Sequence, residues 1–293
     1  MNTSELINLY IEGLYMVYLI LAIISSSFVS IVMRVSGKYV RGNYGILAVN
    51  YVICAAMATF LSGVTNLFPR VEGAEFTLRL GIVTGFLYLA GLLLIKINIP
   101  KNGVVLSTIF QKLGLLVQLF ISIAFFGEKP GVIQIIGIVL CLAAVIFINF
   151  EKEQTAIQFK LGLVLILIAS GLCDGMSKVH EELGNSALSE HFLFYTFSVA
   201  LILCIILILV QKEKVGLPEV GYGILLGVPN FFSCRFLLKA LNDVAAVIAF
   251  PTFSVATVVV VTLSGLLIFK ERLSKKQCIS MGMILIALIL LNI

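Results

Sequence analysis

The stretch "FFGEKPGVIQIIG" (residues 125–137) joins an apolar run to a glutamate, a short polar turn and a glutamine six residues after that glutamate. A second stretch, "LIFKERLSKKQCISMG" (residues 267–282), has the same order of features near the C-terminus. A shift of 143 residues superposes Glu128 on Glu271. One loose pattern that occurs twice at matching places predicts an internal repeat.

The repeat extends on both sides of this pattern. A shift of 142 residues aligns "GIVTG" (81–85) with "GILLG" (223–227), and the shift of 143 aligns further polar and aromatic residues. Those further pairs are Lys96 with Lys239, Phe110 with Phe253, and Asn149 with Asn292. Leu, Ile and Val often match by chance in apolar sequence, so the polar pairs support the repeat most strongly.

The composition indicates a multi-pass membrane protein. Of the 293 residues 60% are hydrophobic and only 12% are charged, compared with about 25% charged in an ordinary soluble domain. The apolar runs are long enough to cross a bilayer as helices and too uniformly apolar for barrel strands. They predict ten transmembrane helices, at 14–34, 44–67, 78–97, 103–126, 132–150, 161–180, 192–210, 221–241, 245–269 and 278–293.

The most polar interruption, "EKEQTAIQFK" (151–160), leaves five predicted spans on either side. The predicted organisation is therefore a first five-helix repeat at 1–150, a polar linker at 151–160 and a second repeat at 161–293. Because five is odd, the second repeat enters the membrane from the opposite side. Such inverted repeats are characteristic of secondary transporters, whose binding site lies near mid-membrane where the repeats meet.

The paired motifs resemble the EamA-type, ten-helix branch of the drug/metabolite transporter (DMT) superfamily over essentially the whole chain. The resemblance implies that helices 1 to 4 and 6 to 9 surround a central cavity, with helices 5 and 10 outside it or at a dimer contact. Members of the superfamily carry amino acids, nucleotide sugars, phosphorylated sugars, choline or lipophilic cations, so the family leaves the substrate open. Two positions depart from the repeat: Thr108 stands where the second half has Pro251, and Ser280 matches Gly137.

Three ionisable residues fall deep inside predicted spans that run in the same direction. At 1.5 Å per residue, Lys112 lies about 14 Å into its helix, Asp174 about 20 Å and Arg235 about 21 Å. Charged groups at such depths are expensive and usually functional. These depths predict one mid-membrane cluster of two positive charges and one negative charge. In an alternative interpretation, Asp174 and Arg235 form a buried ion pair that only fixes helix packing.

Further polar and aromatic residues can line the same cavity. Prolines inside two helices are predicted hinges, because proline removes a backbone hydrogen bond, although both can be passive kinks. Serines more often support helix packing, and Lys178 and Lys239 lie near helix ends, where they can reach the interface. Glu128 and Glu271 are assigned to connecting the final helices.

The predicted substrate-binding residues are Lys112, Gln111, Asp174, Arg235, Asn230, Thr108, Ser27, Tyr88, Thr252 and Ser254, and the predicted hinges are Pro229 and Pro251.

Several classes of function are disfavoured by missing motifs. All six cysteines lie in apolar runs without a CxxC pair, which argues against metal sites and disulfides. The sequence has no GxxxxGK[ST] phosphate loop and no GxSG or HExxH pattern. We therefore predict a protein that is not an enzyme, needs no cofactor or metal, binds no nucleic acid and uses no ATP.

The leading prediction is a secondary transporter, in the cell membrane, of a small polar metabolite with an anionic group. The alternative is proton-coupled efflux of lipophilic cations, with a non-transporting assembly subunit as a minor alternative. Predicted partners are the substrate, the bilayer, a coupling proton or counter-substrate, and a second copy through helices 5 and 10 if the protein is not a monomer. Lys and Arg residues are concentrated on the side that carries Arg34, Lys160 and Lys276, which places both termini outside the cytoplasm.

Overall fold

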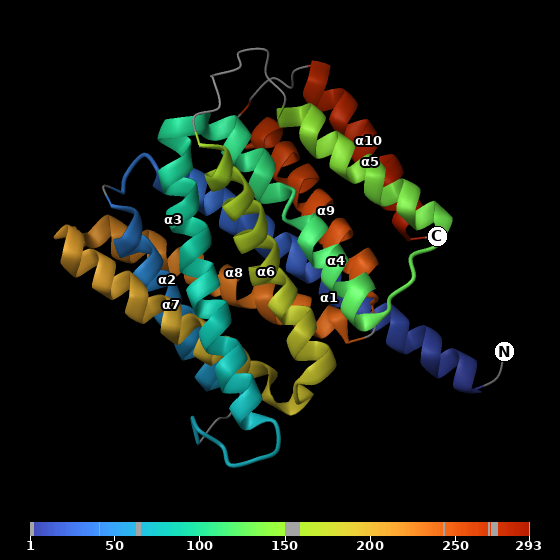
Figure 1. Cartoon of the computed structure of the whole chain (residues 1–293), viewed down its shortest axis with the longest axis horizontal. Helices are drawn as coiled ribbons and strands as arrows, with labels where there is room; N and C mark the ends of the chain where they lie inside the picture. The colour runs from blue at the N-terminus through green and yellow to red at the C-terminus, as the bar shows by residue number, and fades with distance from the viewer. Residues whose placement is uncertain are drawn as a thin grey trace. The chain divides into compact units, whose positions relative to one another are not determined.

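The computed structural model describes residues 3–40, 42–62, 66–149, 159–242, 244–268, 270 and 275–292. These residues form ten α-helices and one short 3-10 helix (Figure 1). The elements are α1 (Thr3–Ser36), α2 (Asn43–Ser62), α3 (Ala74–Lys112), α4 (Leu115–Phe126), α5 (Val132–Asn149), α6 (Lys160–Leu183), η1 (Ser186–Leu188), α7 (Ser189–Gln211), α8 (Leu217–Leu241), α9 (Ala246–Leu267) and α10 (Lys275–Leu291).

Within the described part of the chain, eight stretches of helix are long and apolar enough to cross a membrane, and two shorter apolar helices lie in α5 and α10. The all-helical, polytopic class predicted from the apolar runs is confirmed. The two spans predicted at 78–97 and 103–126 correspond to the apolar stretches Ala74–Asn102 and Ser107–Phe126, but no helix end separates them, because α3 continues from Ala74 to Lys112. The helix break comes later, at residues 113–114, between α3 and α4.

The continuity of α3 has a local cause near Pro100, which lies inside the helix. Proline cannot donate a backbone hydrogen bond and bends a helix, and the ribbon of α3 turns sharply in its C-terminal part (Figure 1). Two buried asparagines lie on either side of Pro100 in the sequence: Asn98 donates to the Leu94 carbonyl at 2.8 Å, and Asn102 donates to the Asn98 side chain at 2.8 Å. The chain therefore turns without leaving helical geometry.

The helices form two compact units, and each unit takes segments from both halves of the sequence. The first unit comprises Met1–Leu89 and Met176–Asp243, and the second comprises Ala90–Gly175 and Val244–Ile293. The helices α1, α2, α7 and α8 belong to the first unit, and α4, α5, α9 and α10 to the second. The division into sequence repeats at 1–150 and 161–293 remains a prediction.

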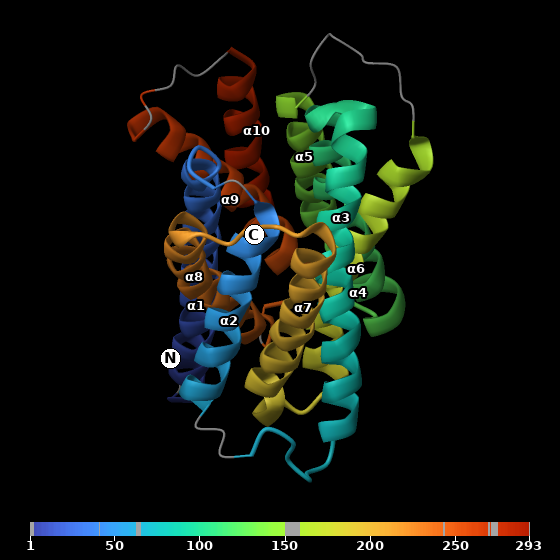
Figure 2. The same cartoon turned by 90° about the vertical axis from the view of Figure 1, so that its left-hand side faces the viewer.

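Within the first unit, the two matched glycine motifs pack in matching ways. Figure 2 shows α2 between α7 and α8, in agreement with its contacts to both helices. A Cβ atom at Gly81 of α3 would lie 2.7 Å from Cβ of Tyr195 on α7, and one at the matched Gly223 of α8 would lie 2.5 Å from Cβ of Val49 on α2. The third helix of each predicted repeat thus packs on the second helix of the other.

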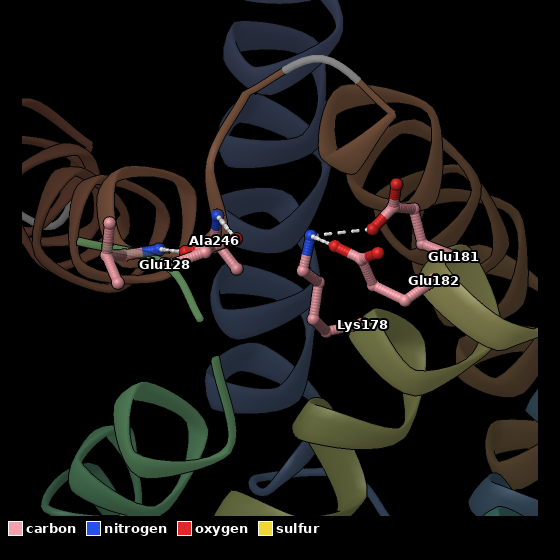
Figure 3. A network of polar contacts seen from close by, with 6 residues as sticks. Glu128, Lys178, Glu181, Glu182 and Ala246 are labelled. Carbon is pink, nitrogen blue, oxygen red and sulfur yellow. Dashed lines mark hydrogen bonds and ion pairs between the residues drawn. The ribbon is translucent and has the colours of Figure 1, made fainter. Parts of the chain in front are cut away.

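Within the second unit, α4 packs on α9 and α5 packs on α10. Glu128, in the α4–α5 connection, accepts hydrogen bonds from the backbone N–H groups of Ala246 and Val247, at 2.9 and 2.8 Å (Figure 3). These donors belong to the first turn of α9, where backbone N–H groups have no partner inside the helix. Glu128 therefore caps α9. Its repeat partner Glu271 lies outside the described residues.

Candidate functional site

The break between α3 and α4, in the second unit, is held by close backbone packing. The N–H of Gly114 donates to the Gln111 carbonyl at 3.1 Å, which closes a turn at the end of α3. A Cβ atom on Gly171 of α6 would lie only 2.3 Å from the Gly114 carbonyl oxygen, and one on Gly114 would lie 2.4 Å from Oγ of Ser170. Only glycine at both positions permits this approach. The motif "GLCDG" (171–175) therefore packs directly against the helix break.

Polar side chains gather around this break. Ser170 Oγ donates to the Gln111 carbonyl at 3.0 Å, and Gln118 Nε2 donates to Asp174 Oδ2 at 2.8 Å. Lys112, the last residue of α3, interacts electrostatically with Asp174, and both side chains are exposed. Among the described residues, Lys112 forms no ion pair within 4.0 Å.

Four buried polar atoms of the second unit have no hydrogen-bond partner within the described part of the chain: Gln118 Oε1, Ser122 Oγ, Thr252 Oγ1 and Ser280 Oγ. Gln118 and Ser122 are four residues apart, so they lie on the same face of α4. Buried polar groups are normally satisfied by protein, water or ligand. We define the break site as Gln111, Lys112, Gln118, Ser122 and Asp174.

The first unit contains a second polar group, an ion pair between α8 and α7. Arg235 Nε donates to Glu190 Oε1, and the two side chains are 21% and 16% exposed. In the alternative interpretation of the sequence, Asp174 is the partner of Arg235. In the structure Arg235 pairs with Glu190, and Asp174 accepts from Gln118. Glu190 is not among the predicted site residues because the predicted span 192–210 starts after it, whereas α7 begins at Ser189.

Two of the predicted site residues in the first unit contribute to helix packing. Asn230 Nδ2 donates to Asn50 Oδ1 at 3.2 Å, which joins α8 to α2. The hydroxyl of Tyr88 lies 3.2 Å from Sγ of Cys234, which joins α3 to α8. The Tyr88 ring also contacts Tyr51 edge to face. Their polar groups therefore already have protein partners.

The remaining predicted residues have varied surroundings. Ser27 is 1% exposed and donates to the Ile23 carbonyl of its own helix at 2.7 Å, as a packing serine does. Thr108 and Ser254 are half-buried. Pro229 and Pro251 lie inside α8 and α9, and both helices continue past them. Their roles as ligand or hinge residues remain predictions.

The expectation that Lys178 reaches the membrane interface is wrong. Its side chain is 5% exposed, and its Nζ lies 2.7 Å from Glu181 and 2.6 Å from Glu182 (Figure 3). The two glutamates follow Lys178 by three and four residues, the spacing that brings helix side chains together. Burial is tolerated because the ammonium group stays paired. Lys239 Nζ lies 5.2 Å from the centre of the Tyr18 ring, a cation–π contact, and its reach to the interface remains a prediction.

Comparison with known proteins agrees with the paired motifs. An uncharacterized protein of Haemophilus influenzae is 27% identical over 271 residues, which cover 88% of this chain and 91% of that protein. A protein of known crystal structure, 16% identical, has the same fold with a TM-score of 0.73 over 95% of this chain and 96% of the other. Residues 160–293 match the EamA-like transporter family. Over this part of its length the chain, a multi-pass membrane protein, is therefore similar to EamA-like transporters.

Proposed function

We propose that this protein is a secondary transporter, in the cell membrane, of a small polar metabolite that carries an anionic group. The observation that supports this proposal most directly is Lys112. It is a cation in a predicted membrane span, its side chain is exposed, and it forms no ion pair with any described residue. A charge at such a position costs about 3 kcal/mol or more. An acidic substrate would repay this cost each time it binds.

The other polar groups of the break site suit the rest of such a molecule. Gln118 Oε1 and Ser122 Oγ are buried without a partner among the described residues, so they can bind a hydroxyl or amino group of the substrate. Asp174 is held by Gln118 and can neutralise Lys112 in the empty transporter or accept an ammonium group. The substrate class is therefore an amino acid, an organic acid or a phosphorylated compound.

Transport would proceed by alternating access, in which one repeat moves against the other about the bound substrate. Pro229 and Pro251 are the proposed bending points, because each leaves a carbonyl without its helical hydrogen bond. The coupling partner is a proton or a second substrate. A homodimer through α5 and α10 is the proposed assembly if the protein is not a monomer.

Efflux of lipophilic cations is the alternative. Its support is Asp174, an exposed carboxylate at the break site. Against it, Lys112 already interacts electrostatically with that carboxylate, and Gln118 donates to one of its oxygens. A cationic substrate would have to displace both interactions.

The test begins with a thermal-shift screen of the purified protein, since a ligand that binds the folded state raises the apparent stability. The screen includes amino acids, organic acids, sugar phosphates and tetraphenylphosphonium. The compound that stabilises the protein most is then used for uptake into proteoliposomes. The variants are Lys112→Gln, Lys112→Met and Asp174→Asn, and the matched control is Lys129→Gln, which removes an exposed lysine of the α4–α5 connection.

We expect acidic compounds to stabilise the wild-type protein and both Lys112 variants to lose uptake at least tenfold, with Lys129→Gln unchanged. Uptake by Lys112→Gln at the wild-type rate and equal membrane content would contradict the proposal. Stabilisation by tetraphenylphosphonium alone, lost in Asp174→Asn, would favour the efflux alternative.

A further inference from the structure

The ion pair between Arg235 and Glu190 uses only one side of the guanidinium group. Glu190 Oε1 accepts from Nε of Arg235. The two terminal nitrogens, Nη1 and Nη2, make no hydrogen bond to any residue that the structure describes. The Arg235 side chain is partly exposed, at 21%, although it lies inside the membrane-spanning stretch Leu217–Leu241. The N–H donors of Nη1 and Nη2 therefore remain available to a ligand within a membrane-spanning stretch.

An open guanidinium edge of this kind suits a planar or tetrahedral oxyanion. Arginine has five N–H donors in a fixed fork, and two parallel donors match two oxygens of a carboxylate or phosphate. The pair with Glu190 has no net charge, so its attraction for an anion depends on hydrogen-bond direction. Lysine, a compact point charge, cannot replace this geometry. The pair is thus suited to select by shape, whereas Lys112 attracts by charge.

The surroundings hold both partners in place. In the two residues before Arg235, Ser233 Oγ donates to the Ala22 carbonyl at 3.4 Å and Cys234 Sγ lies 3.2 Å from the Tyr88 hydroxyl. These contacts attach the segment that carries Arg235 to α1 and α3. Glu190 lies in the first turn of α7, where the helix dipole favours a carboxylate. Both groups are therefore fixed before any ligand arrives.

We propose that Arg235 binds the acidic group of the transported molecule through Nη1 and Nη2, and that Glu190 is a positioning residue that holds the guanidinium by Nε. This inference rests on the proposed function, because it requires an acidic substrate. It adds a recognition element of stated chemistry, an oxyanion with at least two free oxygens. Carboxylate and phosphate share this chemistry, and the experiment separates them.

The test measures the affinity of purified, full-length protein for succinate and for glycerol 3-phosphate, with succinamide and glycerol as neutral counterparts. Affinity is obtained from the concentration dependence of the thermal midpoint. The variants are Arg235→Lys, Glu190→Ala and Glu190→Gln. Glu75→Ala is the matched control, because it removes a carboxylate that pairs with Arg79 in an ion pair of which both side chains are 76% exposed. Lys112→Gln is measured beside them.

We expect one acidic probe, and not its neutral counterpart, to stabilise the wild-type protein, and that probe identifies carboxylate or phosphate as the recognised group. Arg235→Lys keeps the charge but loses the fork, so it should weaken binding about tenfold or more. Glu190→Ala should weaken binding to a similar extent. Glu190→Gln retains an acceptor oxygen at the same reach and should recover most of the affinity. If the ion pair were purely structural, these substitutions would instead lower the thermal midpoint measured without ligand and leave the affinity for the acidic probe unchanged.

The outcomes separate this inference from the proposed function. If Lys112→Gln loses affinity while Arg235→Lys and Glu190→Ala bind as wild type, the role of the pair is refuted and the proposed function stands. If no acidic probe stabilises the wild-type protein, the acidic substrate class fails and this inference fails with it. If Glu190→Ala does not fold, Arg235→Lys and Glu190→Gln still test the proposal. Equal affinity of the wild type and Arg235→Lys would refute binding of the oxyanion by the two terminal nitrogens of Arg235.

Discussion

Replacing Gly171 by alanine tests whether close packing holds the break between α3 and α4. The added Cβ would lie 2.3 Å from the Gly114 carbonyl oxygen and 2.5 Å from Cβ of Val117. Ordinary contact begins near 3.4 Å, so α6 and the break must separate by about 1 Å, and overpacking of this kind costs roughly 1–3 kcal/mol. The nearest obstacle is a backbone atom, which cannot rotate away as a side chain can.

The control for this substitution is Gly282→Ala in α10, where a Cβ meets nothing within 4 Å. Both substitutions replace a helical glycine and gain up to about 1 kcal/mol of helix propensity. The difference between the two variants therefore isolates the packing cost. We expect Gly171→Ala to be about 1–3 kcal/mol less stable than Gly282→Ala.

The assay is unfolding in mixed micelles of mild detergent and SDS, followed by circular dichroism, together with the affinity for the best ligand of the thermal-shift screen. Because Lys112 and Gln111 end α3 at this break, a displaced α6 should also weaken the binding of that ligand. Equal stability and equal affinity of the two alanine variants would refute the assignment of Gly171 to the support of the break site.

Three further predictions concern other parts of the molecule. Glu128→Ala removes the acceptor of two N–H groups of α9 and should destabilise the second unit by about 1–2 kcal/mol in the same unfolding assay, whereas Glu128→Gln should recover part of this loss; a stable Glu128→Ala would contradict the capping role. Lys178→Met leaves Glu181 and Glu182 without their cation and should cost about 3–5 kcal/mol, and the triple variant that combines Lys178→Met with Glu181→Gln and Glu182→Gln should regain stability. A C-terminal reporter that is active only outside the cytoplasm should be active, as the charge bias of the loops predicts, and cytoplasmic activity would reverse the predicted orientation.

The parts of the fold that could be predicted from sequence are those that apolar length and repetition determine. The motifs "GIVTG" and "GILLG" were found as a matched pair, and the structure packs them on α7 and α2 in equivalent ways. The continuation of α3 past Pro100 was not predictable from apolar runs. A proline inside an apolar run normally predicts a helix end or a kink, whereas α3 continues past it.

The candidate site was less predictable, because it depends on helix ends. Glu190 was overlooked since the polar first turn of α7 made the apolar run appear to begin two residues later. The buried state of Lys178 was missed, although the spacing to Glu181 and Glu182 was visible. Ser122 continues the polar stripe of Gln111 and Gln118 by one more helical step, a signal that could have been followed.

The predicted repeat indicates where the specific chemistry of this protein should reside. At the shift of 143 residues, Lys112 corresponds to Val255, which is fully buried, and Gly114 corresponds to Thr257, whose hydroxyl donates to the Phe253 carbonyl of its own helix at 2.7 Å. The second copy is thus a continuous, apolar helix, whereas the first copy is broken and polar at the same place.

A position that differs in this way between two copies of one scaffold is not needed for the scaffold to fold, because the other copy folds without it. The free-energy cost of placing Lys112 in a span and of breaking the helix after it must then be offset by an interaction that the fold itself does not provide. We propose that the binding of an acidic substrate provides it. The substitution Lys112→Val makes the two copies alike at this position. It should leave the protein at least as stable as the wild type in the absence of ligand and remove the stabilisation by acidic compounds; a loss of stability without ligand would show that Lys112 serves the fold after all.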